Sequence, residues 1–401
     1  MSKIVDQEGW SLELEANKST KEIFEAILES RNFENNISLY DIAKLGLVLE
    51  KWYQLLPSIR PFYAVKCNPD PFVVSRMVSL GIGFDCASKH ELELVKSSNA
   101  NIENDVIFAQ TIKSNRDLAA ISNLSVKYAT FDCVEELRKI ANFGLPNLKL
   151  VLRIFEIDEK AILSFRHKFG AIKTDWVNIF EEAVKLGIDI AGVSFNVGSR
   201  VKDTNAYFRA IRAADEVWNL GEQYGFNMHL LDIGGGFTFQ NFENAAEEIN
   251  RGINQYFSER KVQIISEPGI FFAETIVSSC FSIVGKRSRI INGENKVDYF
   301  LSDGLIGTFS SLRFYSDIIP KPILLGRNRG EGQKVLSTLY GPTCNGLDKI
   351  VECEFEDAEI GDMVAFENMG AYNQALATDF NGIPMASNTK LYIFEQDSVT
   401  N

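Results

Sequence analysis

Short apolar runs, rich in β-branched and aromatic residues, recur through the first two-thirds of the chain. The first five follow one another about every 22 residues, and the later spacing widens to roughly 35 to 45. Between them lie stretches with apolar residues at helical spacing, such as 89–97 and 177–186. Eight buried strands that alternate with helices predict an α/β fold built on a (β/α)8 barrel. The predicted strands are 62–68, 83–88, 106–110, 128–132, 148–154, 191–199, 229–236 and 264–269.

Polar residues or glycines end nearly every one of these runs. In a (β/α)8 barrel the carboxyl ends of the strands build the active site, so such residues are expected to face a ligand. Any single one of them has an alternative role in capping a strand or beginning a helix, but the whole set favours a site. The set comprises 66–68, Asp85, Gln110, Asp132, Arg153, Asn196, Ser199, 234–236 and Glu267.

The pattern changes after about residue 275 to shorter strands separated by Gly and Asn turns, such as 297–301, 335–340 and 363–366. This predicts a C-terminal all-β domain, with 286–294 and 325–334 as exposed loops. A short strand at 11–14 is expected to join this second domain. The expected boundaries are therefore 1–33 for an N-terminal segment that joins the β domain, 34–275 for the barrel and 276–401 for the β domain.

Net charge, apolar content, and the cysteine and histidine counts limit the classes of partner and cofactor that the chain is expected to bind. The formal net charge of -13 argues against nucleic-acid or anionic-membrane partners, which reward clustered Lys and Arg. We expect no secretory signal, because the N-terminus MSKIVDQEGW lacks an apolar core, and no membrane span, because no uninterrupted apolar run reaches the roughly 20 residues that a span needs. Six scattered cysteines without a C-x-x-C pair indicate reduced thiols in a cytoplasmic protein, and three histidines make a multi-histidine metal centre unexpected.

Lys66 lies in an apolar segment, Tyr63-Ala64-Val65-Lys66-Cys67, which is a poor environment for an unpaired ammonium. Burial disfavours the charged form and lowers the pKa of a lysine, and a neutral lysine is a nucleophile for an aldehyde. The alternative is a lysine paired with a buried carboxylate such as Asp85.

Two further segments carry candidate chemistry in the barrel. Gly234, Gly235 and Gly236 follow an apolar strand, and their backbone N–H groups suit a phosphate, although a plain tight turn remains open. The G-x-G-x-x-G dinucleotide motif is absent. Glu267, in Glu267-Pro268-Gly269, could keep a pyridine nitrogen protonated so that the ring accepts electrons, or could simply belong to a turn.

Cys344 adds a thiol in a turn-forming segment of the second domain.

Together these segments resemble the eukaryotic ornithine decarboxylase family, in order, from about residue 40 onward. The resemblance is specific because several segments are long and their order and spacing fit. It implies a pyridoxal 5'-phosphate (PLP) enzyme in which a barrel binds the cofactor and a β domain follows. The segments are RPFYAVKCN, GFDCASKHELELV, LRI, SFNVGSR, LLDIGGGF, ISEPG, SDGLIGTF, YGPTCNGLD and FENMGAYNQALATDFNG.

The resemblance also implies roles for individual residues. Lys66 matches the lysine bonded to PLP, and Glu267 matches the partner of its ring nitrogen. Cys344 matches the thiol that reaches the site from a second subunit and protonates Cα after CO2 leaves. Lys168 and Asp348 match a cross-subunit ion pair, so a homodimer with shared sites is expected. The remaining cofactor-binding matches are Asp85, Arg153, Asn196, Ser199, Gly234, Gly235, Gly236 and Tyr372.

Four positions depart from the family pattern. Asn196 replaces a histidine that stacks on the cofactor ring, and Ile270 replaces an arginine that pairs with its phosphate. Losing that charge-assisted contact costs about 1.5–3 kcal/mol of PLP binding, or roughly tenfold or more in affinity. At the substrate end, Ser316 and Asn345 replace two aspartates that receive the distal ammonium of ornithine; Ser316 follows Tyr315, and the adjacent Asp317 could serve in its place.

Three functions remain open at this point. The first is decarboxylation of a basic amino acid, with L-ornithine giving putrescine for polyamine synthesis. The second is an active relative with an altered amino-acid substrate, which Ser316 and Asn345 favour. The third is a catalytically weak binding protein like the antizyme inhibitors, which Asn196 and Ile270 favour and for which antizyme would be the partner. Alanine racemase shares the architecture but uses a tyrosine base, and the Cys344 motif argues against that chemistry.

Overall fold

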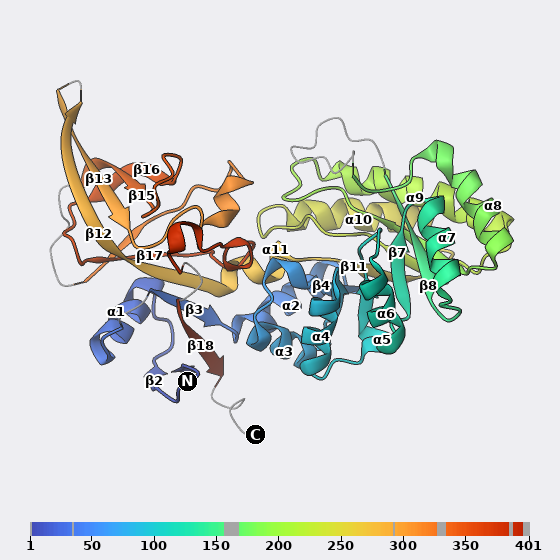
Figure 1. Cartoon of the computed structure of the whole chain (residues 1–401), viewed down its shortest axis with the longest axis horizontal. Helices are drawn as coiled ribbons and strands as arrows, with labels where there is room; N and C mark the ends of the chain where they lie inside the picture. Colours follow the sequence, from blue (N-terminus) through green and yellow to red (C-terminus); the bar gives the residue numbers. More distant parts are fainter. Residues whose placement is uncertain are drawn as a thin grey trace. The chain divides into compact units, whose positions relative to one another are not determined.

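The structure is a computed structural model that describes residues 2–33, 36–155, 168–291, 293–326, 334–384 and 388–395. Its contacts divide the chain into two compact units (Figure 1). The barrel unit is Gly46–Phe272, and the sheet unit combines the residues before 46 with those from 273 onward.

The barrel unit contains a closed barrel of eight parallel strands, joined in chain order from β4 to β11 and closed by pairing of β11 with β4. This confirms the predicted (β/α)8 barrel, and each of the eight predicted runs overlaps one strand. The strands are β4 Ile59–Ala64, β5 Gly83–Cys86, β6 Val106–Phe108, β7 Tyr128–Phe131, β8 Lys149–Ile154, β9 Ile190–Phe195, β10 Leu230–Asp232 and β11 Gln263–Ser266.

Helices connect these strands (Figure 1). Their apolar residues are buried, as expected for amphipathic helices that cover a barrel. Several begin directly after the polar strand ends because a side chain caps them. Ser88 accepts a hydrogen bond from the N–H of Glu91, and Asp70 accepts from the N–H groups of Phe72 and Val73. The helices are α2 Lys44–Leu55, α3 Pro71–Ser79, α4 Lys89–Ser97, α5 Ile102–Asp105, α6 Asn115–Asn123, α7 Val134–Phe143, α8 Trp176–Leu186, α9 Asn205–Gln223, α10 Phe242–Tyr256 and α11 Ile270–Ala273.

An aromatic cluster around the buried Trp52 anchors two of the segments expected to bind ligand. Its ring centroid lies 5.3 Å from that of Phe237, which follows the glycine run, and 5.6 Å from that of Phe271, which follows Glu267-Pro268-Gly269-Ile270. The indole N–H of Trp52 donates to the carbonyl of Ile59 at 2.9 Å. Dense packing against Trp52 therefore fixes the positions of the loops after β10 and β11.

The sheet unit is a mostly antiparallel β structure, which agrees with the predicted all-β domain, and the helix α1 Thr20–Ser30 belongs to it. The strand order along its main path is β16-β15-β13-β12-β3-β18-β1-β2. Its strands are β1 Ser2–Val5, β2 Ser11–Leu14, β3 Ile37–Asp41, β12 Val277–Ile291, β13 Glu294–Leu301, β14 Ile323–Leu325, β15 Lys334–Tyr340, β16 Lys349–Glu356, β17 Met363–Phe366 and β18 Thr389–Glu395. Although β3 lies within the range that the sequence assigns to the barrel, it pairs with β12 and β18.

The predicted loop at 286–294 is wrong for its first six residues, because β12 continues to Ile291 and pairs with β13 as a long hairpin (Figure 1). Arg287 and Arg289 give this stretch a loop-like composition, but both guanidinium groups form ion pairs with the buried carboxylate of Asp298 on β13. Those ion pairs stabilise the ladder. Residues 327–333 of the other predicted loop lie outside the described residues.

No helix among the described residues is both long enough and apolar enough to cross a membrane.

Candidate active site

The barrel interior carries an apolar row of side chains and, two residues further along the strands, a polar row. Phe62, Ile107, Val151, Leu230 and Ile265 pack as one cluster with Tyr128 beside them. Gly83 and Gly192 belong to the same level, because a Cβ atom there would collide with Phe62 and Leu230. Side chains alternate along a strand, so the residues two positions later face the same interior. We call these six residues the polar row: Asp85, Thr130, Arg153, Ser194, Asp232 and Glu267.

Four buried oxygen atoms of the polar row accept or donate no hydrogen bond within the described part of the chain. They are Asp85 Oδ1, Thr130 Oγ1, Ser194 Oγ and Asp232 Oδ2. Leaving such a group unpaired costs about 1–3 kcal/mol. A concentration of them at the carboxyl ends of barrel strands therefore indicates a place built for a polar ligand.

Lys66 lies just beyond β4, in a single 3-10 turn, Val65–Cys67, and not in a strand as the sequence suggested. The parallel ladder ends where Ala64 pairs with Asp85, and the chain then turns toward α3. The ammonium of Lys66 forms an ion pair with the Asp85 carboxylate, and 45% of the Lys66 side chain is exposed. The paired lysine considered as the alternative is thus what the structure contains, and it stands beside the polar row with open access.

The glycine run forms a backbone cradle next to the polar row. A Cβ atom at Gly235 would lie 2.5 Å from the Glu267 carbonyl oxygen, and Gly236 adopts a φ of +105° that disfavours other residues. The buried hydroxyl of Tyr207 donates to the carbonyl of Gly235 at 2.8 Å and holds the segment in place. At Gly234 a Cβ atom would lie 2.2 Å from the Phe195 carbonyl oxygen, and its N–H donates to Asp232 Oδ1 at 2.9 Å. These contacts explain the three glycines, and the N–H groups of Gly235 and Gly236 suit a phosphate.

The segment after β9 lies against this cradle, since the N–H of Val201 donates to the carbonyl of Gly236 at 3.1 Å. Asn196 uses its side-chain oxygen to accept from the N–H of Gly198 at 3.0 Å. Ser199 follows, half-buried, in the same segment. Ile270 is buried as the first residue of α11, so its position adds apolar contact and no charge.

Three carboxyl groups and two cations share the mouth of the barrel. Burial raises the pKa of Asp232 to about 7, and the loss of solvation together with the neighbouring Asp232 and Asp85 raises the pKa of Glu267 well above its ordinary value. Lys66 and Arg153 act on Glu267 in the opposite direction. The Arg153 guanidinium also lies 4.9 Å from the ring centroid of Phe169.

Cys344 belongs to the sheet unit and has an exposed thiol. Its backbone N–H donates to Asn381 Oδ1 at 3.0 Å, and Asn381 holds a left-handed φ of 61°. Asn345 directs its side-chain oxygen to the N–H of Leu347 at 3.0 Å. The loop that presents the thiol is therefore fixed by local hydrogen bonds.

Asp348, four residues after Cys344, is buried within the sheet unit and strongly hydrogen-bonded there. Its carboxylate accepts from the N–H of Leu305 at 2.7 Å and from the N–H and hydroxyl of Thr343 at 3.1 and 2.6 Å. Lys168, expected as its cross-subunit partner, is exposed in the barrel unit with its ammonium 4.9 Å from the Phe169 ring centroid. The interior hydrogen bonds of Asp348 give it a structural role whatever else it binds.

The remaining predicted residues lie in the sheet unit. The ring of Tyr315 is 6.5 Å from that of Tyr372, whose φ of 54° is left-handed. Ser316 and Asp317 are exposed beside Tyr315. Tyr315 and Tyr372 therefore lie close together within the sheet unit.

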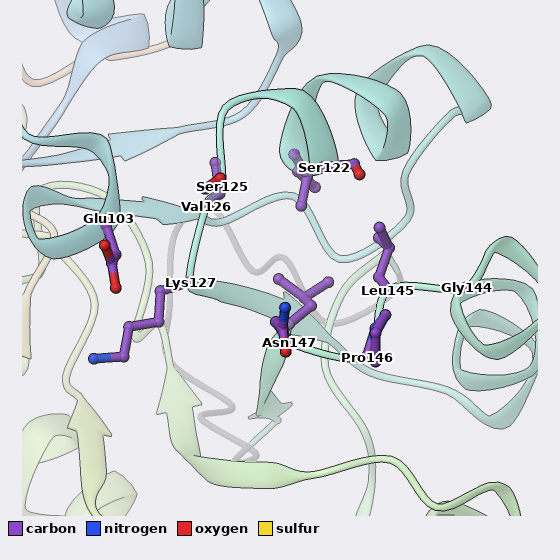
Figure 2. A pocket seen from close by; sticks show the side chains of 11 residues that line it. Glu103, Ser122, Ser125, Val126, Lys127, Gly144, Leu145, Pro146 and Asn147 are labelled. Carbon is purple, nitrogen blue, oxygen red and sulfur yellow. The ribbon is translucent and has the colours of Figure 1, made fainter.

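A surface pocket of about 410 Å³ lies at the opposite end of the barrel strands, between the connections that enter β7 and β8. Figure 2 shows Glu103 and Lys127 on one side of it and Leu145 and Pro146 on the other. Residues at the amino-terminal face of such barrels serve stability more often than chemistry. The described residues also contain no cluster of His, Cys, Asp and Glu able to hold a metal ion.

Two family profiles cover most of the chain. The pyridoxal-binding domain of the pyridoxal-dependent decarboxylases matches residues 43–274, and the C-terminal sheet domain of the same family matches residues 273–370. The chain belongs to the pyridoxal-dependent decarboxylases. Its cofactor is therefore PLP.

Individual relatives differ in activity. Mouse ornithine decarboxylase is 36% identical over 92% of this chain and 84% of its own length. Antizyme inhibitor 2 of Xenopus laevis is 37% identical over 90% of this chain and 83% of its own. Among solved structures, the arginine decarboxylase of Paramecium bursaria Chlorella virus superposes with a TM-score of 0.88 at 34% identity, covering 93% of this chain and all of that one.

The geometry of the barrel fits this cofactor. PLP presents an aldehyde, a phosphate and a ring nitrogen, and the site offers an accessible lysine, a glycine cradle and a carboxyl group. The unpaired oxygens of the polar row supply further polar contacts for a bound ligand.

Sequence reasoning missed Thr130, Ser194 and Asp232. Their signal was present, because each follows an inward-facing residue by two positions. It was hidden by the continuous apolar runs, which do not show which alternate residues face the barrel interior.

Proposed function

We propose that the chain decarboxylates L-ornithine to putrescine and CO2, as a homodimer with shared active sites. The observation that carries the proposal is the polar row with its four unpaired buried atoms beside Lys66 and the glycine cradle. The similarity to mouse ornithine decarboxylase supports ornithine as the first substrate to test.

Each residue set has a distinct role in the proposal. Lys66 binds the cofactor aldehyde, and Asp85 orients its amine through the ion pair. Gly235 and Gly236 bind the phosphate through their backbone N–H groups, with Ser199 and Tyr372 completing the set. Gly234 shapes the turn of this phosphate-binding segment, while its own N–H donates to Asp232 Oδ1. Asn196 and Arg153 flank the ring.

PLP, when bound, supplies a ring that accepts the electrons left behind when CO2 departs. Glu267 faces the ring nitrogen and favours its protonated form. The Sγ–H group of Cys344, from the second subunit, gives a proton to the substrate Cα and so replaces the lost carboxylate. Tyr315, Asp317 and Asn345 contact the distal end of the substrate, and Ser316 lies beside them.

Specific observations support two alternative functions. Asn345 and Ser316 are neutral, and the similarity to the viral arginine decarboxylase extends over the whole of that chain, so another basic amino acid is the second candidate. The buried, uncharged Ile270 and the similarity to Xenopus antizyme inhibitor 2 support an antizyme-binding protein as the third.

The test is CO2 release from L-ornithine, L-lysine and L-arginine with excess PLP, with Lys66→Ala as the blank. Release from ornithine above that blank supports the proposal. Release from lysine or arginine alone replaces the substrate. Absence of release from all three, with antizyme bound by the purified chain, would establish the regulatory role instead.

A further inference from the structure

Asp232 and Glu267 stand on neighbouring strands and face the same interior. Asp232 is the last residue of β10, and its Cα partner on β11 is Ile265, two residues before Glu267. Leu230 and Ile265 share the apolar cluster below them. Alternation along both strands therefore directs the two carboxyl groups into the same barrel interior from neighbouring strands.

The surroundings of Asp232 leave one oxygen without a donor. Asp232 is 1% exposed, and its Oδ1 accepts from the N–H of Gly234 at 2.9 Å. Its Oδ2 has no partner among the described residues, although the Glu267 side chain lies within hydrogen-bonding reach. Two ionised carboxylates offer only acceptors, whereas one proton between them makes this contact a hydrogen bond.

Charge gives an independent reason for that proton. The groups that face the pair are Asp85, Lys66 and Arg153. With both members of the pair ionised, three negative charges would stand against two positive ones. With one shared proton, the charges of the cluster balance, which is the cheaper arrangement in a poorly solvated interior.

We propose that Asp232 is a positioning residue for Glu267, holding on Oδ2 a proton that it donates to the Glu267 carboxylate. Burial raises the pKa values of both carboxyls, and the two groups share one proton. We place that proton on Asp232 because its side chain is 1% exposed, whereas Glu267 is half-buried and its charge is better solvated. The remaining Glu267 oxygen is then an acceptor, aimed by the hydrogen bond, for a protonated ring nitrogen. This role rests on the proposed function only through the cofactor that Glu267 meets.

The first test uses the cofactor-free protein. At pH 7 its infrared spectrum should contain the C=O stretch of a protonated carboxylic acid, and Asp232→Asn should remove that band. Asp303→Asn is the matched control: burial raises the pKa of this other carboxyl to about 6, so the band at pH 7 should survive in that variant. Absence of the band in the unsubstituted protein, or its persistence in Asp232→Asn, would overturn the proposal, and the first of these needs no variant to fold.

The second test separates positioning from packing. Asparagine can accept from Gly234 and donate to Glu267, as protonated Asp232 does, whereas alanine cannot donate. Asp232→Asn should therefore keep PLP affinity within about twofold, and Asp232→Ala should weaken it about tenfold and shift the pH profile of the bound-cofactor absorbance. Equal behaviour of the two variants would refute the role. Neither readout requires turnover, so a chain that fails to release CO2 can still pass both tests.

Discussion

The two units of the molecule each contain a group of buried carboxyls, and the two groups differ in how their oxygens are bonded. In the sheet unit, Asp303 accepts from the N–H groups of Gly304 and Thr308 at 2.6 and 2.9 Å and from the Thr308 hydroxyl. Asp348 beside it accepts three hydrogen bonds of its own. In the barrel unit, Asp85 and Asp232 each retain an unpaired oxygen.

For these four carboxyls the difference separates a structural role from availability to a ligand. Asp298 on β13 is an exception, because its Oδ1 is unpaired while Arg287 and Arg289 both hold its Oδ2. A buried carboxyl whose oxygens are all bonded stabilises the loops that supply its donors, here the segments around Thr308 and Thr343. A buried carboxyl with an oxygen left over is costly in the protein alone and is useful when something binds. Substitutions in the first group should therefore affect stability, and those in the second should affect cofactor binding and turnover.

The largest expected effect is on turnover. Glu267→Gln removes the charge that faces the ring nitrogen but keeps a group that hydrogen-bonds, so kcat should fall by about 10²–10³. The free energy of unfolding should change by less than about 1 kcal/mol. Steady-state CO2 release and urea unfolding measure the two quantities. A loss of stability comparable to the loss of activity would contradict the distinction between the carboxyls of the barrel unit and those of the sheet unit.

Asp303→Ala should have the opposite profile. It leaves the N–H and hydroxyl of Thr308 unpaired in a buried loop and should cost about 3–5 kcal/mol of unfolding free energy. Trp10 is the sheet unit's only tryptophan, so the Trp10→Phe background identifies which unfolding signal belongs to that unit. PLP affinity measured on the folded variant should stay within about twofold, and a larger loss would contradict the separation.

The pH dependence of stability provides a smaller test. Burial raises the folded-state pKa of Asp303 to about 6, above the roughly 3.9 of an unfolded aspartate. The folded state therefore binds more protons in this range, and this group's stabilisation is complete below about pH 4 and is lost as pH rises through 6. The loss amounts to at most about 3 kcal/mol. Asp303→Asn should flatten the curve of unfolding free energy between pH 4 and 6, and an unchanged curve would rule out this carboxyl as its source.

The smallest effect concerns the phosphate end of the site. Ile270→Arg places a cation at the start of α11, next to the segment that ends in Glu267-Pro268-Gly269. One charge-assisted contact should tighten PLP binding about tenfold, read from equilibrium dialysis. Ile270→Met, of similar length and uncharged, is the control. If both variants bind PLP equally, Ile270 does not face the phosphate.

The sequence predicted the barrel well because parallel strands buried on both faces read as continuous apolar runs. It predicted Lys66, Asp85, Arg153 and Glu267 as site candidates because they interrupt or end those runs. It did not predict Asp232 as one, because a polar residue inside a run has no distinguishing mark until the inward face is known. The strand at 286–291 was missed for a related reason: Arg287 and Arg289 look like loop residues until Asp298 is placed opposite them.

The 3-10 turn at Lys66 could not be predicted either, since Val65 and Cys67 continue the apolar composition of the strand before them. The end of the ladder is set by the pairing of Ala64 with Asp85. Such an end depends on the neighbouring strand and not on local sequence.

The central claim is that the polar row and Lys66 hold PLP. Borohydride reduction of the PLP-loaded protein, followed by peptide mapping with mass spectrometry, tests it most directly. The account predicts one pyridoxyl group per chain, on Lys66, and none on the buried Lys113, whose ammonium is bonded to Glu136 and to the carbonyls of Thr111 and Thr130. A pyridoxyl group on another lysine, with Lys66 unmodified, would contradict the claim.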